Sequence, residues 1–152
     1  MTSYTKSTTI TQKERETSTT FEGVTTTTKV STGSIIKRSS KGAIAFKSVH
    51  PRGANIIIEN VTSGAGEKSQ SLKGWYVQRS EAGSAATDIP LKDFVLEPRA
   101  IYTIWAKGAK DKATADNEQV SDEVSLCHGS YTLTLLDEAG NEMATCVAKF
   151  SG

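Results

Sequence analysis

Only two cysteines and three prolines occur among the 152 residues of this chain, and aromatic residues make up 7% of it. Two cysteines are too few to staple a small domain, which excludes the disulfide-rich scaffolds of secreted proteins. Both Cys127 and Cys146 follow Trp75, so the cysteine–tryptophan–cysteine order of antibody domains is also absent. We therefore expect free thiols in a reducing, intracellular setting.

The chain also lacks an excess of charge of one sign, since 18 basic residues face 17 acidic ones. This balance gives no strong general attraction to nucleic acid or to anionic membranes. No apolar run approaches the roughly 20 residues of a membrane helix, and residues 1–6 lack the apolar core of a signal peptide. An apolar heptad pattern is missing as well, so no coiled-coil rod is predicted.

The first 40 residues contain few large apolar side chains. Half of these positions are Ser or Thr, including the runs 17–20 and 25–28. Such a segment buries too little apolar surface to offset the entropy lost on ordering. We predict a disordered Ser/Thr-rich linker over residues 1–40 and a folded domain over residues 41–150.

From Lys41 onward, short runs of β-branched and aromatic residues alternate with Gly, Pro and polar turns. The expected strands cover residues 43–49, 55–61, 74–79, 94–96, 101–106, 131–136 and 143–150, with short segments at 86–89 and 123–126. The stretch 107–122 predicts a solvated loop, and Gly140 predicts a hairpin turn. About seven to nine short strands without a long amphipathic helix predict an all-β fold, an immunoglobulin-like β-sandwich.

Two tryptophans lie inside these strand-like runs. Gly74 precedes Trp75, and Pro98 introduces the run that ends in Trp105. Such tryptophans could stack on a ligand, but in apolar strands they more often fill the core. We predict that both indoles lie between the sheets.

A metal or catalytic site would need His and Cys residues in suitable pairs. His50, Cys127, His128 and Cys146 are the available groups, and no two of them show the spacing of a zinc-binding pair. Adjacent residues on a strand point to opposite faces, which argues against Cys127 and His128 as a nucleophile and base. Cys146 is expected to be a small core residue. We predict no catalytic residue, no metal, no cofactor and no enzyme activity.

Basic residues gather at the predicted boundary between the linker and the domain: Lys37, Arg38, Lys41, Lys47 and Arg52. They could bind DNA phosphates, but the balanced charge and the lack of a groove-reading helix favour a solvated face. Ser39 and Ser40 follow Lys37-Arg38, as in targets of basophilic kinases. We identify them as candidate phosphorylation sites, where phosphate would add negative charge beside the basic residues.

Four segments of the chain resemble the lamin tail domain, the immunoglobulin-like module of nuclear lamins and of many invertebrate cytoplasmic intermediate filament proteins. They are residues 42–46; 56–62, with Ile57 and Asn60; 72–77, with Gly74 and Trp75; and 96–105, with Leu96 and Trp105. The resemblance covers residues 41–150. It departs from the family at residues 125–128, where lamins carry Trp-Gly-x-Gly, and at Arg99, where the family has Gly after Pro or Ala.

The chain has neither a compact nuclear-import cluster nor a C-terminal prenylation box, which favours the cytoplasmic branch, as in nematodes. The resemblance implies a structural or interaction module, the tail domain of a cytoplasmic intermediate filament protein. Its partners would be filament rods, other tails and junction or cytoskeletal proteins, and the domain itself would be monomeric.

Alternatives remain open. The chain could be a nuclear lamin-like adaptor that binds chromatin, DNA or envelope proteins, or an accessory module of a phosphoesterase or nuclease. It is also either the tail portion of a larger filament protein or a rodless relative built from the tail module alone.

Overall fold

The computed structural model describes residues 15–21, 24–31, 34–50, 53–81, 85–110, 115–123 and 129–150. Its regular elements are β1 (Arg15–Phe21), β2 (Val24–Ser31), β3 (Ser34–Ser40), β4 (Ile44–Val49), β5 (Asn55–Asn60), the 3-10 turn η1 (Gly64–Gly66), β6 (Gln70–Ser71), β7 (Tyr76–Glu81), β8 (Thr87–Pro90), β9 (Val95–Leu96), β10 (Ile101–Trp105), β11 (Glu118–Val120), β12 (Tyr131–Leu136) and β13 (Glu142–Phe150). The predicted all-β fold is confirmed. Within the described residues, no helix has the length and apolar character needed to cross a bilayer.

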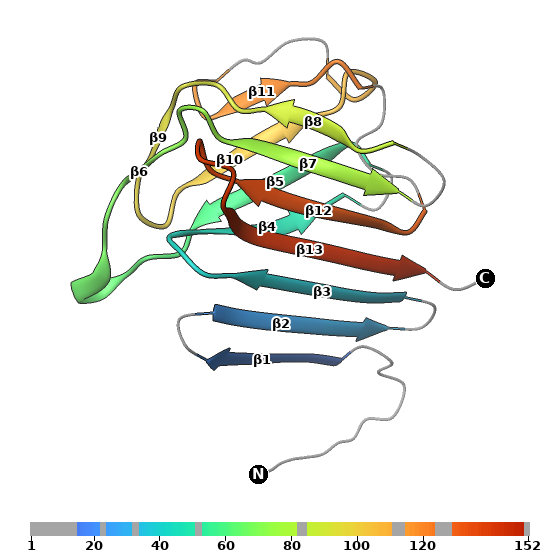
Figure 1. Ribbon diagram of the computed structural model, residues 1–152, viewed down its shortest axis with the longest axis horizontal. Coiled ribbons are helices and arrows are strands. Elements are labelled where there is room, and N and C mark those ends of the chain that lie inside the picture. The colour runs from blue at the N-terminus through green and yellow to red at the C-terminus, as the bar shows by residue number, and fades with distance from the viewer. Residues whose placement is uncertain are drawn as a thin grey trace.

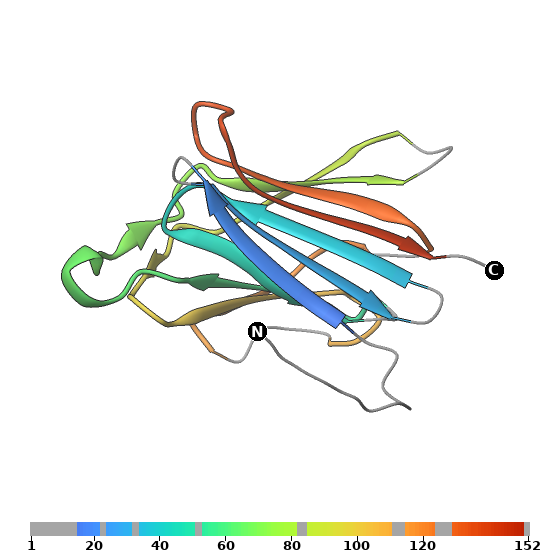
Figure 2. The same ribbon diagram turned by 90° about the horizontal axis from the view of Figure 1, so that it is seen from below.

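Two sheets form the layers of a sandwich (Figures 1 and 2). The seven-stranded sheet has the order β1-β2-β3-β13-β12-β7-β8, and the four-stranded sheet has the order β11-β10-β5-β4. A small third sheet pairs β6 with β9. The strands pair antiparallel except for β10 and β11, which run parallel. This arrangement confirms the predicted immunoglobulin-like β-sandwich.

The core lies between the two sheets and follows the period-two alternation of the strands. In β12 every second residue is buried, including Leu133 and Leu135, and in β5 the inward residues are Ile56 and Ile58. Tyr102 and Ile104 of β10 complete this layer. Burying each such side chain contributes about 1.5–3 kcal/mol, so the alternation selects one register for each strand.

The structure differs from the predicted disorder over residues 15–40, because this part forms β1, β2 and β3. The physical reason is a partner far along the chain: β3 pairs with β13 at seven successive positions, and Ile36 packs against the core. β3 in turn pairs with β2, and β2 pairs with β1. The folded part therefore begins before Lys41, whereas residues 1–14 lie outside the described residues.

Strands β1 and β2, which we call the threonine ribbon, differ from the rest of the sheet. The seven-stranded sheet is wider than the four-stranded sheet, and no described side chain of the ribbon belongs to the core. Figure 1 shows the ribbon at the lower edge of the sheet, beyond β3. It is held by backbone pairing and short polar side chains rather than by apolar burial.

Other local predictions have mixed outcomes. The predicted loop 107–122 contains β11, which pairs with β10. Gly140 has the expected positive φ, 85°, in the hairpin between β12 and β13. Asp137 closes this hairpin by accepting hydrogen bonds from the amides of Ala139 and Asn141, at 3.0 and 2.9 Å. The predicted strand at 123–126 falls largely on residues outside the described part of the chain.

Candidate functional site

The predicted motif residues occupy two different faces of the sandwich. Trp75 is 5% exposed and belongs to the core, and Leu96 is fully buried. Trp105 is only half-buried. It lies on the outer face of the four-stranded sheet, because three positions separate it from the inward Tyr102 and an odd separation reverses the face of a strand. The prediction that Trp105 fills the core is wrong.

Trp105 is instead held at the surface by charged neighbours. Its indole N–H donates to Glu118 Oε2 at 3.0 Å, and Lys110 Nζ lies 5.0 Å from the ring centroid. Lys110 Nζ also contacts Glu118 Oε1 at 2.7 Å. This cation–π and ion-pair cluster satisfies the polar atom of the indole and covers its ring, which accounts for a tryptophan on an outer face.

Ile57, like Trp105, is a motif residue that faces outward. Its neighbours Ile56 and Ile58 are fully buried, and Ile57 points to the outer face, where it is half-buried opposite Thr103. An unbroken run of three isoleucines does not reveal which of them face the core. The register of β5 against β10 decides it.

Asn60 is a fully buried polar residue whose side chain is fully engaged. Its Nδ2 donates to the carbonyls of Lys68 and Leu96, at 2.7 and 2.9 Å. Its Oδ1 accepts from the amide and hydroxyl of Thr62, at 3.0 and 2.6 Å. The Asn-x-Thr motif is therefore a bracket that ties the end of β5 to β9 and to the loop after η1.

Two turn positions explain the other motif residues. Gly74 has φ +80°, and a Cβ at this position would lie 2.9 Å from the Cβ of Glu138. Arg99 has φ +64° and lies in the turn closed by the hydrogen bond from Ala100 N to Glu97 O, 3.0 Å. A positive φ favours glycine. The departure from the family pattern at Arg99 therefore puts a non-glycine residue in a strained position, with Glu67 as its ion-pair partner at 3.1 Å.

Two of the basic residues at the predicted boundary, Arg38 and Lys47, lie beside carboxylates. Arg38 Nη2 contacts Glu16 Oε2 of β1 at 3.1 Å, and Arg38 Nη1 donates to the carbonyl of Lys47 in β4. Lys47 Nζ lies 3.8 Å from Glu59. Lys37 and Lys41 are exposed, and Arg52 lies outside the described residues. Arg38 thus joins the ribbon to the four-stranded sheet.

A groove of about 510 Å³ lies between the threonine ribbon and the edge of β4. Glu16, Ser18 and Thr27 line it from the ribbon, and Phe46 and Lys47 line it from β4. The groove exists because β1 and β2 extend beyond the narrower opposite sheet. The sequence carried no signal for it, since it depends on the unequal widths of the two sheets.

The candidate phosphorylation sites lie in β3. The hydroxyl oxygens of Ser39 and Thr145 are 2.6 Å apart, across the pairing of β3 with β13. Both Ser39 and Ser40 are half-buried. Modification of either residue remains a prediction, and at Ser39 a kinase would need the β3–β13 pair to open.

No group of three or more His, Cys, Asp and Glu side chains in the described residues is arranged to hold a metal ion. Cys127 and His128 lie outside those residues. Cys146 is a free thiol on β13, 1% exposed, and burial raises its pKa to about 11. Cys146 is thus a core side chain. Because it stays protonated at neutral pH, it is also a poor nucleophile.

Comparison with known proteins relates this sandwich to cytoskeletal proteins. No protein-family model matches the chain. A non-neuronal cytoplasmic intermediate filament protein of Cornu aspersum is 61% identical over 123 residues, which is 80% of this chain and 21% of that protein. Intermediate filament protein A of Ascaris suum is 28% identical over 118 residues, 76% of this chain and 23% of that protein.

The matches confirm the resemblance to invertebrate cytoplasmic intermediate filament proteins. The cytoplasmic description of the snail protein agrees with the predicted cytoplasmic location. The chain spans about a fifth of the length of these relatives, so only a segment of them is compared. Over that segment, the chain is similar in sequence to these two intermediate filament proteins of a snail and a nematode.

Proposed function

We propose that this chain acts as a non-catalytic tail module of cytoplasmic intermediate filaments. The observation that carries the proposal is the 61% identity to the snail filament protein over most of the chain. An identity of this size includes the surface as well as the core, so it supports a shared binding role as well as a shared fold.

The module would act by presenting strand edges and surface loops to its partners. These partners are intermediate filament rods, other tail modules and junction or cytoskeletal proteins. An edge strand offers unpaired backbone N–H and C=O groups, to which an added strand can bind. The rigid sandwich holds these edges in fixed positions, and many weak contacts along one filament would add up through effective concentration.

The nuclear alternative has less support from the surface. A lamin-like adaptor that binds DNA would need basic side chains free to neutralise phosphates. Arg38 and Lys47 lie beside Glu16 and Glu59 instead. The ion pairs lower the positive potential of this face, so a cytoplasmic filament role is favoured.

Co-sedimentation tests the proposal. The 152-residue chain is mixed with filaments reassembled from the snail protein and centrifuged, and the bound fraction is measured against chain concentration. We expect saturable recovery in the pellet that weakens little in 0.3 M salt. A variant with a charge in the core, Ile58→Asp, is the unfolded control.

A second readout is the location of a tagged chain in molluscan cells. We expect it on cytoplasmic filaments. A chain that stays in the supernatant at every concentration, or that accumulates on chromatin, contradicts the proposal.

A further inference from the structure

Among the described residues, the two main sheets end in four edge strands, and three of these edges are blocked. At the edge formed by β8, Asp88 and Pro90 interrupt a strand of four residues. At the edge formed by β11, the strand is only three residues long. At the edge formed by β4, a register shift lies at Lys47, whose carbonyl is already occupied by Arg38. Short length, proline, charge and bulges all prevent an added strand from binding.

The fourth edge, β1, has none of these protections along its central part. All seven of its residues pair with β2 in an unbroken register, from Arg15 opposite Val30 to Phe21 opposite Val24. The centre, residues 17–20, is Thr-Ser-Thr-Thr, without charge or proline. Glu16 is paired with Arg38 at 3.1 Å, so its charge is compensated. Figure 1 shows β1 as the outermost strand of the sheet, and Figure 2 shows that the four-stranded layer does not fold over it.

We propose that β1 pairs antiparallel with β1 of a second copy of this chain, across a twofold axis, so that two seven-stranded sheets become one. A twofold axis normal to the sheet keeps both four-stranded layers on the same side of the joined sheet. The β1 edge then serves as the contact surface in both copies. The contact deepens the proposed function by giving the module a self-association surface, and it can form without a filament.

The second copy fits because the observed neighbour of β1 already has the same chemistry. Residues 17–20 of β1 pair with the threonine run 25–28 of β2. On one face, Ser18 Oγ lies 3.2 Å from Thr27 Oγ1, and Thr20 Oγ1 lies 3.0 Å from Thr25 Oγ1. A symmetry-related β1 presents the same hydroxyl-bearing run to the free side of the strand. Cross-strand threonine pairs of this kind are favourable.

Symmetry also selects the register. Pairing all seven residues across a twofold axis centres the contact on Ser18, which then faces its own copy. Thr17 lies opposite Thr19, and Glu16 lies opposite Thr20, so no like charges face each other directly. Any other centre leaves residues of β1 unpaired. The strand sequence is thus self-complementary.

The dimer has room for both sandwiches. Between the two β3 strands lie β2, β1 and their copies, which is about five interstrand spacings of roughly 4.8 Å, or about 24 Å. The contacts between the two layers at this side of the sandwich are those of β4 with β3 and β13. The association proposed here belongs to the threonine ribbon and differs from the monomeric state expected from the sequence.

Site-directed cross-linking tests both the dimer and its register. Ser18→Cys is compared with Thr26→Cys on β2, each in the full chain with Cys127→Ser. Cys146 is left unchanged in both variants because it is buried. Opposite residues in a strand pair have Cβ atoms about 4.5–5.5 Å apart, which is close to the distance of a disulfide. We expect disulfide-linked dimers at least tenfold faster for Ser18→Cys. Equal rates for the two variants overturn the proposal.

A second pair of variants keeps the test independent of cysteine chemistry. Thr19→Lys and Thr26→Lys add the same charge at directly paired positions, but only Thr19 lies on the free edge. Sedimentation velocity of the unmodified chain should show a dimer fraction that rises with concentration. We expect Thr19→Lys to be monomeric and Thr26→Lys to dimerise, with both variants folded by circular dichroism.

The outcomes separate this inference from the filament proposal. A chain that is monomeric at all concentrations but sediments with filaments overturns only the dimer. If Thr19→Lys then loses filament binding, the β1 edge takes a filament strand and not a second copy, which also overturns the dimer. A dimer that fails to bind filaments overturns only the proposed function.

Discussion

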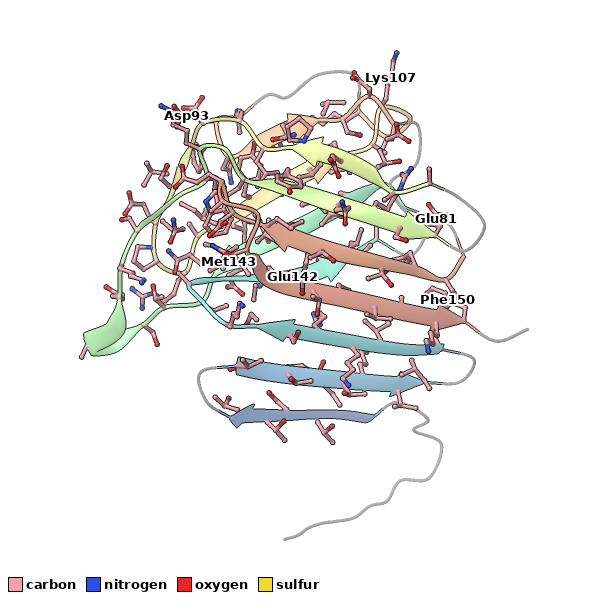
Figure 3. All side chains as sticks on the ribbon, in the orientation of Figure 1. Glu81, Asp93, Lys107, Glu142, Met143 and Phe150 are labelled. Atoms are coloured by element: carbon pink, nitrogen blue, oxygen red, sulfur yellow. The ribbon has the colours of Figure 1, made fainter. Side chains whose placement is uncertain are left out.

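The sandwich and the threonine ribbon are both built from antiparallel strands, yet different forces hold them. In the sandwich, the inward residues of β5, β10 and β12 are fully buried apolar side chains such as Ile58, Ile104 and Leu133. In β1 and β2 most of the described side chains are threonine or serine, drawn as sticks in Figure 3, and none belongs to the core. Strand pairing therefore continues across the sheet after apolar burial has ended, and we expect this part of the sheet to be less stable.

Truncating a core side chain should give the largest loss in the free energy of unfolding. Leu133→Ala removes a fully buried side chain and leaves a cavity, so we expect the free energy of unfolding to fall by about 2–5 kcal/mol. Thr28→Ala, in the ribbon, should lower it by less than about 0.5 kcal/mol. Urea unfolding followed by tryptophan fluorescence measures both. Equal losses would mean that the ribbon is as well packed as the sandwich.

Removing the hydrogen bonds of the bracket around Asn60 should give the second-largest loss. Asn60→Ala leaves the carbonyl of Leu96 and the amide of Thr62 without their partner in a buried site. We expect a loss of about 1–3 kcal/mol in the free energy of unfolding. Thr62→Val, which keeps the shape but loses one hydroxyl, is the matched variant and should cost less. A neutral Asn60→Ala would show that the bracket does not stabilise the sandwich.

Arg38 joins the two regions, so its replacement should loosen the ribbon more than the sandwich. Arg38→Ala removes the contacts to Glu16 and to the carbonyl of Lys47. The ion pair is partly exposed, and we expect about 1 kcal/mol or less in global stability. Proteolysis between β1 and β3 should nevertheless become severalfold faster. Arg38→Lys is the control that keeps the charge. Unchanged proteolysis would contradict the proposed link.

The smallest effect is expected at Arg99 and has the opposite sign. Arg99→Gly relieves a positive φ that costs a non-glycine residue about 1–2 kcal/mol, and part of this gain is lost because glycine makes the unfolded chain more flexible. We expect a net stabilisation of about 0.5 kcal/mol, measured as a higher melting temperature. Arg99→Ala removes only the ion pair with Glu67 and should not stabilise the protein.

The sequence predicts the sandwich well because its strands carry their own alternation. Leu133 and Leu135 alternate with threonines in β12, which identifies both the strand and its buried face. Gly74-Trp75 marks the turn into β7 for a similar local reason. These features depend on neighbours in the sequence, so they can be predicted without the fold.

The features that were missed depend on partners distant in the sequence. Strand β3 forms because β13, more than 100 residues later, offers a free edge, and the ribbon then forms on β3. Trp105 faces outward because Glu118 and Lys110 cover it there. Local composition indicates only that residues 15–40 bury little apolar surface. It does not indicate that β13 provides a sheet edge with which β3 can pair.

Native-state hydrogen exchange measures the stability of the two regions separately, and so shows whether apolar burial stabilises the sandwich while strand pairing and polar contacts hold the ribbon. We predict that amides of β5 and β12 exchange only through global unfolding, whereas those of β1 and β2 exchange through local opening at a much lower free energy. Protection of β1 should also increase with protein concentration if the dimer forms. Equal protection of β1 and β5 in dilute solution would show that the ribbon is as stable as the sandwich and would contradict this prediction.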